Sequence, residues 1–252
     1  MLKHSVAVVL LVVGASAASA DELKVFSGGA PQQVLRAVIP MFEQASGHKV
    51  NITFQVVSQI QRRLAAGEQV DLIVLPEQLI AEVEKSMPLR GEGRGALARV
   101  GTGVIVREGA ARPDISNEDA VRRSLRAAKA ITLSPAENPN GQYLDSLLVR
   151  MGLAEELKPR LIRKAAIDGG GELVAKGEAD IGLYLASEAQ HIPGTTMIGF
   201  LPPALQNYVV YGTAIPASNH MPEAALAFIR FLTAPANADR WRQGGLEPTA
   251  KP

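Results

Sequence analysis

Hydrophobic positions along the first third of the chain form short apolar runs that alternate with segments of helical spacing. The run Val25–Phe26 predicts a strand, and apolar residues three and four apart from Val34 to Ile39 predict the helix that follows. Gly47 then acts as a helix-ending residue. The same alternation predicts strands at residues 24–26, 49–56 and 71–75 and helices at residues 31–45, 58–67 and 77–85. Such a series is typical of an open α/β sheet with parallel strands.

A second series of the same kind begins at Ala130. It predicts strands at residues 131–133, 162–166 and 180–185 and helices at residues 141–151, 155–161 and 172–176. Between the two series lie a Gly- and Arg-rich segment at 86–99, which predicts a solvated loop, a strand at 100–107 and a helix at 120–128. A strand at 208–216 and helices at 222–233 and 235–243 follow, and we expect them to return to the first series.

The pattern therefore predicts an α/β protein of two lobes, each an open, mostly parallel sheet flanked by helices. We expect one lobe to comprise residues 21–100 and 209–252 and the other residues 101–208. The chain is expected to cross between the lobes near 99–103 and 206–211.

Residues 1–20 have the organisation of a secretory signal peptide. A basic start at Lys3 precedes an apolar run, and Ala18 and Ala20 match a small-residue cleavage site. The run is too short for a membrane-spanning helix, and no later run is long and apolar enough for one. The sequence thus predicts a periplasmic protein cleaved near Ala20.

Composition excludes several function classes. Loss of Lys3 with the signal peptide would leave equal numbers of basic and acidic residues, which argues against a nucleic-acid partner. The chain contains no cysteine, so thiolate chemistry and disulfides are excluded. The histidines beyond the predicted signal peptide, His48, His191 and His220, fall in predicted turns without metal-ligand spacing. We therefore expect no metal and no cofactor.

Four predicted helix starts follow strands and present unpaired backbone N–H groups, which favour anions. Two lie in each predicted lobe, at Ser27-Gly28-Gly29-Ala30, Val57-Ser58-Gln59, Asn140-Gly141-Gln142 and Asp168-Gly169-Gly170. Ligands of open sheets sit beyond the carboxyl ends of the strands, and clefts between lobes are common ligand sites. We therefore expect a small anion between the lobes, although Asp168 with its glycines is also explained as a simple capped turn.

The mature chain resembles the periplasmic type II solute-binding proteins of ABC importers, most closely their molybdate-binding branch. The residues that carry the resemblance are Val25-Phe26-Ser27-Gly28-Gly29-Ala30, Phe54 to Leu64, Gly67-Glu68 with Asp71-Leu72, Pro139-Asn140-Gly141, Gly177 to Tyr184, and Leu201-Pro202-Pro203. The resemblance implies two lobes that close on a hinge over a small anion, an inner-membrane ABC permease as partner, and a monomer.

The resemblance also implies a ligand set, from which this chain departs. Ala30 and Val57 stand where molybdate binders have ligand serines, and Leu185 stands where a tyrosine donates. The ligand is thus left open between a molybdate-like oxyanion and an organic carboxylate, which Arg62 or Arg63 could bind unless they form a solvated helix face. The residues predicted to bind the ligand are Ser27, Gly28, Gly29, Ala30, Val57, Ser58, Gln59, Asn140, Gly141, Asp168, Gly169 and Tyr184.

Two other functions remain open. Some proteins that resemble this branch are aconitate isomerases, and a proton shift needs only a positioned base, for which Asp168, Glu137 and Glu188 are candidates. An effector-sensing domain of a bacterial regulator shares the topology, but the predicted signal peptide and the lack of a DNA-binding helix pair argue against it. A binding protein is the expectation, with the isomerase as its alternative.

Overall fold

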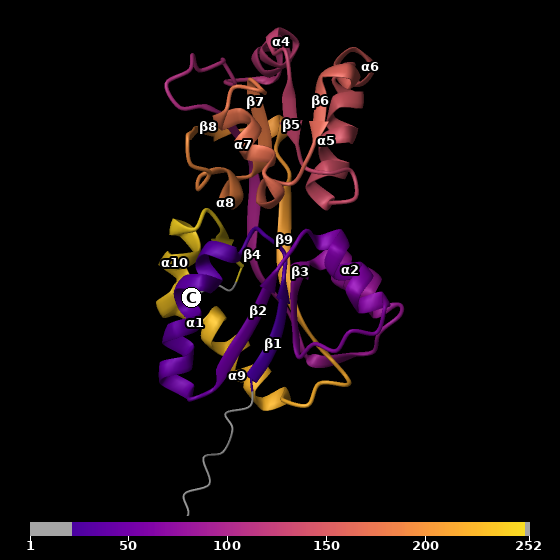
Figure 1. Cartoon of the computed structure of the whole chain (residues 1–252), viewed down its shortest axis with the longest axis vertical. Helices are drawn as coiled ribbons and strands as arrows, with labels where there is room; N and C mark the ends of the chain where they lie inside the picture. Colours follow the sequence, from indigo (N-terminus) through magenta and orange to yellow (C-terminus); the bar gives the residue numbers. More distant parts are fainter. Residues whose placement is uncertain (1–21, 250–252) are drawn as a thin grey trace, which may run out of the picture.

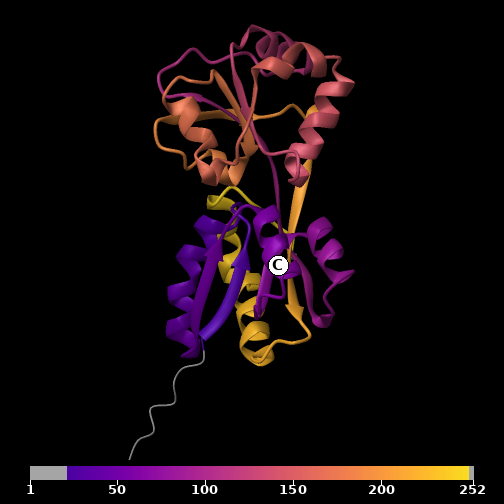
Figure 2. The same ribbon diagram turned by 45° about the vertical axis from the view of Figure 1, so that its right-hand side comes forward.

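The structure is a computed structural model that describes residues 22–249. Two lobes lie one above the other along the long axis, and the long strands β4 (Leu89–Arg107) and β9 (Tyr208–Pro216) run between them (Figures 1 and 2). The predicted two-lobed α/β architecture is confirmed. The predicted signal peptide and its cleavage near Ala20 lie outside the described residues.

The lower lobe in Figure 1, here lobe 1, is built on the strand order β2-β1-β3-β9, with β1 parallel to both neighbours. Its strands are β1 (Glu22–Ser27), β2 (Lys49–Phe54), β3 (Leu72–Pro76) and the short β10 (Glu247–Pro248). Its helices are α1 (Gln32–Ser46), α2 (Val57–Ala65), α3 (Glu77–Glu84), α9 (Pro222–Thr233) and α10 (Ala238–Gln243). Every residue of β3 is buried, as expected of a strand covered on both faces.

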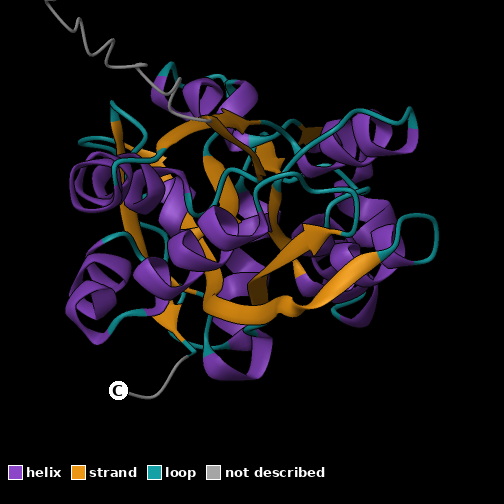
Figure 3. Ribbon diagram, turned by 90° about the horizontal axis from the view of Figure 1, so that it is seen from below, coloured by secondary structure: helices purple, strands orange, loops and turns teal. Residues whose placement is uncertain are grey.

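The upper lobe, lobe 2, continues with the order β4-β7-β5-β6, and β8 pairs with β4. Its further strands are β5 (Ile131–Leu133), β6 (Leu161–Arg163), β7 (Ile181–Leu185) and β8 (Thr195–Phe200). Its helices are α4 (Glu118–Ala127), α5 (Pro139–Arg150), α6 (Ala154–Leu157), α7 (Gly170–Ala175) and α8 (Ala186–Ala189). Viewed along the long axis, helices surround the strands (Figure 3).

The C-terminal helices share their core with the first elements of the chain. The Phe42 ring of α1 packs at a tilt against Phe228 of α9, with 4.8 Å between ring centroids, and both side chains are buried with Trp241 of α10. The indole nitrogen of Trp241 donates to the Leu232 carbonyl at 2.9 Å. The end of the chain therefore packs on lobe 1, and Trp241 is a packing residue.

The prediction of a solvated loop at 86–99 was wrong, because β4 begins at Leu89 and pairs with β9 in this segment. Its glycines suggest a loop by composition, but one of them, Gly93, serves close packing instead. A Cβ on Gly93 would lie 2.3 Å from the Ile215 side chain, so glycine lets the two strands approach. Register shifts after Arg90 and Ala96 bend the strand and obscure its alternation.

The two long strands separate at the middle of the molecule. β4 pairs with β9 up to Gly101 and with β7 from Thr102 onward. There the Gln206 side-chain amide bonds both the N–H and the carbonyl of Thr102, at 2.8 and 3.1 Å. The strands cross between the lobes here, and a hinge at this point stays a prediction.

β8 and β10 were not predicted. β8 is only half-buried throughout and ends in an exposed Phe200, so it has no inward–outward alternation. Within residues 22–249, no helix is long and apolar enough to cross a membrane.

Candidate functional site

Two adjoining cavities lie between the lobes. The inner chamber, of about 30 Å³, is lined by Gly29, Val56, Val57, Pro76, Ser134, Asn138, Pro139, Asn140, Ala165, Ala166, Ile167, Leu185, Glu188, Val209 and Tyr211. The outer chamber, of about 530 Å³, is lined by Gly29, Gln32, Gln33, Arg36, Phe54, Gln55, Gln59, Ala166, Ile167, Asp168, Glu172, Ser187, Glu188, His191, Ile192 and Pro193. Gly29, Ala166, Ile167 and Glu188 belong to both linings, so the two chambers adjoin at these residues.

The lobes touch at Gly29, at the turn between β1 and α1. A Cβ on this glycine would lie 2.6 Å from Oε1 of Glu188 and 2.7 Å from Cγ2 of Ile167. Both partners belong to lobe 2, where Glu188 lies on α8 just beyond β7. Gly29 is therefore buried, and its lack of a side chain permits the closed arrangement.

Glu188 is the main ionisable group of the inner chamber. Burial raises the pKa of its carboxyl to about 7. Burial, and then the charge of Glu188, also raise the pKa of Tyr211 on β9, and the Ala30 backbone N–H donates to the Tyr211 hydroxyl. The same two causes raise the pKa of the buried Tyr184. Glu188 is therefore poised to gain or lose a proton near neutral pH beside two neutral phenols.

Two buried polar atoms at the chambers have no hydrogen-bond partner within the described part of the chain. They are Oδ1 of Asn138, at the inner chamber, and Oγ of Ser187, at the outer one. Asn138 precedes α5 but makes no capping bond. By contrast, the amide of Asn140 accepts from Thr102 at 2.7 Å and donates to Ser134 at 3.3 Å. The free groups at Asn138 and Ser187 are suited to a polar ligand, because unpaired buried polar atoms are costly.

Five of the residues predicted to bind a ligand line the chambers. Gly29, Val57 and Asn140 line the inner chamber, and Gly29, Gln59 and Asp168 line the outer one.

The others line neither chamber: Ser27, Gly28, Ala30, Ser58, Gly141, Gly169 and Tyr184. Two of their hydroxyls are engaged elsewhere, since Ser27 donates to the Gly28 carbonyl at 2.9 Å and Tyr184 to the Lys164 carbonyl at 3.1 Å. A Cβ on Gly141 would lie 1.9 Å from the Pro135 carbonyl oxygen, so this glycine serves backbone packing. A Cβ on Gly28 would lie 3.0 Å from the Tyr211 ring, so this glycine makes room for that ring.

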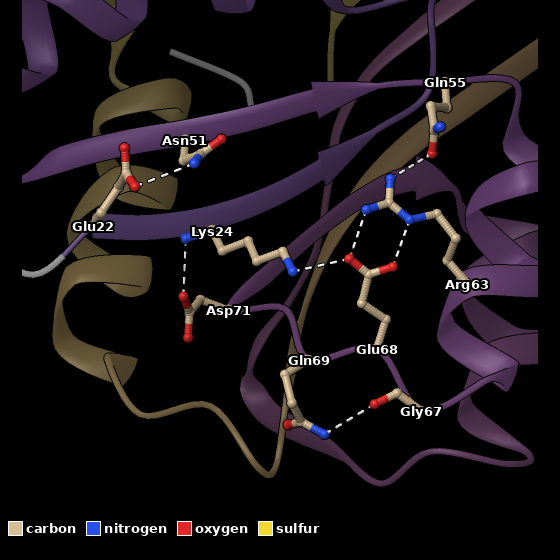
Figure 4. A network of polar contacts seen from close by, with 9 residues as sticks. All are labelled: Glu22, Lys24, Asn51, Gln55, Arg63, Gly67, Glu68, Gln69 and Asp71. Atoms are coloured by element: carbon tan, nitrogen blue, oxygen red, sulfur yellow. Dashed lines mark hydrogen bonds and ion pairs between the residues drawn. The ribbon is translucent and has the colours of Figure 1, made fainter.

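Arg62 and Arg63 do not face the cleft. Arg63 lines neither chamber and is bound within lobe 1, where Nε and Nη2 each lie 2.6 Å from a Glu68 oxygen and Nη1 lies 2.7 Å from Gln55 (Figure 4). Lys24 adds a third bond to Glu68 at 2.9 Å, and the Arg63 guanidinium lies over the Phe26 ring at 4.1 Å. Arg63 is therefore a structural residue, and Arg62 is exposed on the solvated helix face.

The Glu68 network should make the stability of the protein fall in acid. Its bonds to Arg63, and then to Lys24, lower the pKa of Glu68 to about 2. A lowered carboxyl pKa stabilises the fold above the unfolded-state value near 4.5, and this contribution is lost as the pH falls towards 2. Between pH 5 and pH 2, we expect the melting temperature of Glu68→Gln to fall less than that of the wild type. An equal loss in both proteins, measured by circular dichroism, would contradict the assignment.

Sequence reasoning missed several residues of the site. Glu188 was considered only as a base for the alternative function, and Tyr211, Ile167, Asn138 and Ser187 were not considered. Glu188 had a usable signal, because a carboxyl three residues beyond a wholly apolar strand lies at the ligand edge of an open sheet. Tyr211 lies within a long strand, and only the three-dimensional crossing of β9 brings it to the cleft.

Comparison with known proteins places this geometry in a family. A family described as "Bacterial extracellular solute-binding protein" matches residues 23–247. The chain is 30% identical over 234 residues to an aconitate isomerase of a Pseudomonas species, covering 90% of this chain and 87% of that protein. It is 22% identical to the molybdate-binding protein ModA of Escherichia coli (strain K12), covering 93% and 92%.

Among solved structures, the periplasmic molybdate-binding protein of Azotobacter vinelandii superposes with a TM-score of 0.74 at 19% identity. That match covers 91% of this chain and 99% of the other. The sulfate-binding protein SubI of Mycobacterium tuberculosis H37Rv gives 0.72 at 18% identity, with 90% and 87% covered. These structures share the fold of this chain. The family assignment rests on the family match, which spans nearly all of the described residues. The chain belongs to the family of bacterial extracellular solute-binding proteins.

Proposed function

We propose that this protein is the periplasmic receptor of an ABC-type uptake system and that its ligand is a small organic carboxylate. The family supplies the general role, in which a solute-binding protein holds a small ligand and delivers it to a membrane permease. Export by cleavage near Ala20 and delivery by a monomer belong to the same proposal.

The observation that carries the choice of ligand is the presence of Glu188 in the inner chamber. A dianionic oxyanion held without water needs many neutral donors, since buried charge is costly unless it is hydrogen-bonded. Besides the neutral polar residues Ser134, Asn138, Asn140 and Tyr211, the chamber has the carboxyl of Glu188, which would repel a dianion when ionised. A protonated Glu188 can donate to a carboxylate of the ligand, and its raised pKa makes this form accessible near neutral pH.

A ligand panel tests the receptor. Purified protein is heated with trans-aconitate, citrate, malate or crotonate, and in parallel with molybdate, tungstate or sulfate. At 100 times its dissociation constant, a ligand of the folded state stabilises it by about 2.7 kcal/mol, which is a rise of about 5–10 °C for a protein of this size. We expect such a rise with an organic acid and none with the oxyanions. A rise with molybdate alone would contradict the proposal.

A second candidate function is isomerisation of aconitate on the same scaffold. Two observations favour it: the Glu188 carboxyl beside Tyr211, and the 30% identity to a protein named aconitate isomerase. A base of pKa near 7 can take a proton from the methylene carbon of aconitate, the double bond shifts, and the same group returns the proton to the far carbon. No other reactant is needed. Incubating purified protein with cis-aconitate and following the trans isomer by chromatography tests this candidate directly.

A further inference from the structure

The two chambers adjoin and differ in size. They share Gly29, Ala166, Ile167 and Glu188 as lining residues. The inner half, of about 30 Å³, has room for about two waters or one carboxylate group. The outer half is about 530 Å³. A ligand that filled only the inner half would leave most of the cavity unused.

Each half contains a buried polar atom without a partner in the described structure. Asn138 lines the inner half and has a buried Oδ1 without a partner, and Ser187, which is only 2% exposed, lines the outer half and has a buried Oγ without a partner. The two residues follow different strands of lobe 2, Asn138 beyond β5 and Ser187 beyond β7. A ligand that satisfied both atoms would have polar groups at two separated points.

The lobe 1 wall of the outer chamber is cationic and amide-rich. Arg36 projects from α1 and lies over the Phe54 ring, 5.1 Å from its centroid. Several other arginines form ion pairs with carboxylates, but within residues 22–249 Arg36 forms none. Gln32, Gln55 and Gln59 line the same wall. This wall can receive a carboxylate without first breaking an ion pair.

The acidic residues of the outer chamber lie on the opposite wall. Asp168 and Glu172 come from lobe 2. Oε2 of Glu172 lies 3.7 Å from Nζ of Lys176. A carboxylate on the ligand is therefore directed towards Arg36, while hydroxyl groups are accepted on the lobe 2 side.

We infer that the ligand is an organic acid with at least two carboxylates that spans both chambers. One carboxylate lies in the inner chamber beside Asn138 and Glu188, and a second lies in the outer chamber at Arg36, with Ser187 bonding the chain between them. This inference rests on the proposed binding of an organic carboxylate and specifies its class.

The test compares a long and a short acid on the same variants by isothermal titration calorimetry. Trans-aconitate carries three carboxylates, and crotonate carries one next to a similar double bond. We expect wild-type protein to bind trans-aconitate more tightly than crotonate. Arg36→Gln should weaken trans-aconitate binding about tenfold, because a charge-assisted bond is lost, and should leave crotonate binding unchanged. Arg62→Gln, at an exposed arginine outside both linings, is the matched control.

The outcomes separate the inference from the proposed function. Equal binding of both acids, or an Arg36→Gln variant that binds trans-aconitate as the wild type does, overturns the two-carboxylate ligand and leaves the receptor proposal standing. Absence of binding by every acid of the panel, including citrate and malate, overturns the receptor proposal itself. A Ser187→Ala variant is a second test. We expect it to lose less affinity for trans-aconitate than Arg36→Gln does and to bind crotonate unchanged.

Discussion

Replacing Gly29 with alanine should weaken binding of the preferred organic acid about ten- to hundredfold while leaving the free protein as stable as the wild type. The added methyl would overlap Oε1 of Glu188 at 2.6 Å and Cγ2 of Ile167 at 2.7 Å. Overpacking of this kind costs about 1–3 kcal/mol. Both partners lie on lobe 2, so the cost applies to the closed arrangement and not to lobe 1 by itself.

The stability of the free protein should not suffer, because the Gly29 backbone is outside the left-handed region that disfavours side chains. Alanine at such a position reduces the entropy of the unfolded chain and is neutral or slightly favourable. Gly91→Ala is the matched control, since nothing lies within 4 Å of its added Cβ and its backbone is equally permissive.

Calorimetry measures the affinity, and small-angle X-ray scattering measures whether the ligand still compacts the protein. We expect the Gly29→Ala variant to remain more extended at saturating ligand. An unchanged affinity would show that the contact at Gly29 is not part of the ligand-bound state.

Local patterns predicted most of the fold. The strand 208–216 and the helix 222–233 appear in the structure with the predicted bounds, because each has a clear period and a Pro or Gly at its ends. The segment at 86–99 failed for a physical reason. One of its glycines, Gly93, allows close strand approach over Ile215, a long-range contact that composition does not reveal.

The site was less predictable than the fold for the same reason. Gly29, Gln59 and Asp168 follow from the rule that ligands sit at helix starts beyond strands, and all three line the cleft. The hydroxyls of Ser27 and Tyr184 also lie near such starts, yet each bonds a backbone carbonyl instead. Tyr211 and Ile167 reach the cleft only through the crossing of β9 and the approach of the lobes, which no local pattern encodes.

Replacing Glu188 with glutamine should raise the stability of the free protein at pH 8 and leave it unchanged below pH 4.5. Burial raises the pKa of the Glu188 carboxyl from 4.5 to about 7, so between these values the folded state holds a proton that the unfolded state has released. The wild type therefore loses stability as the pH rises to about 7. Such a shift corresponds to about 3 kcal/mol at most, and partial access of water to this side chain reduces the expected gain to about 1–2 kcal/mol.

The same variant separates the two candidate functions, because glutamine keeps the shape and a hydrogen-bond donor but cannot carry a proton. If the protein is a receptor, Glu188→Gln should bind the acid at pH 8 at least as tightly as the wild type, and binding should no longer weaken between pH 6 and pH 8. If it is an isomerase, conversion of cis- to trans-aconitate should fall by about two to four orders of magnitude while trans-aconitate still binds. Glu178→Gln, at an exposed carboxyl outside both chambers, is the matched control and should change none of these measurements. A Glu188→Gln variant that is no more stable than the wild type at pH 8 would contradict the burial of this carboxyl and, with it, both roles.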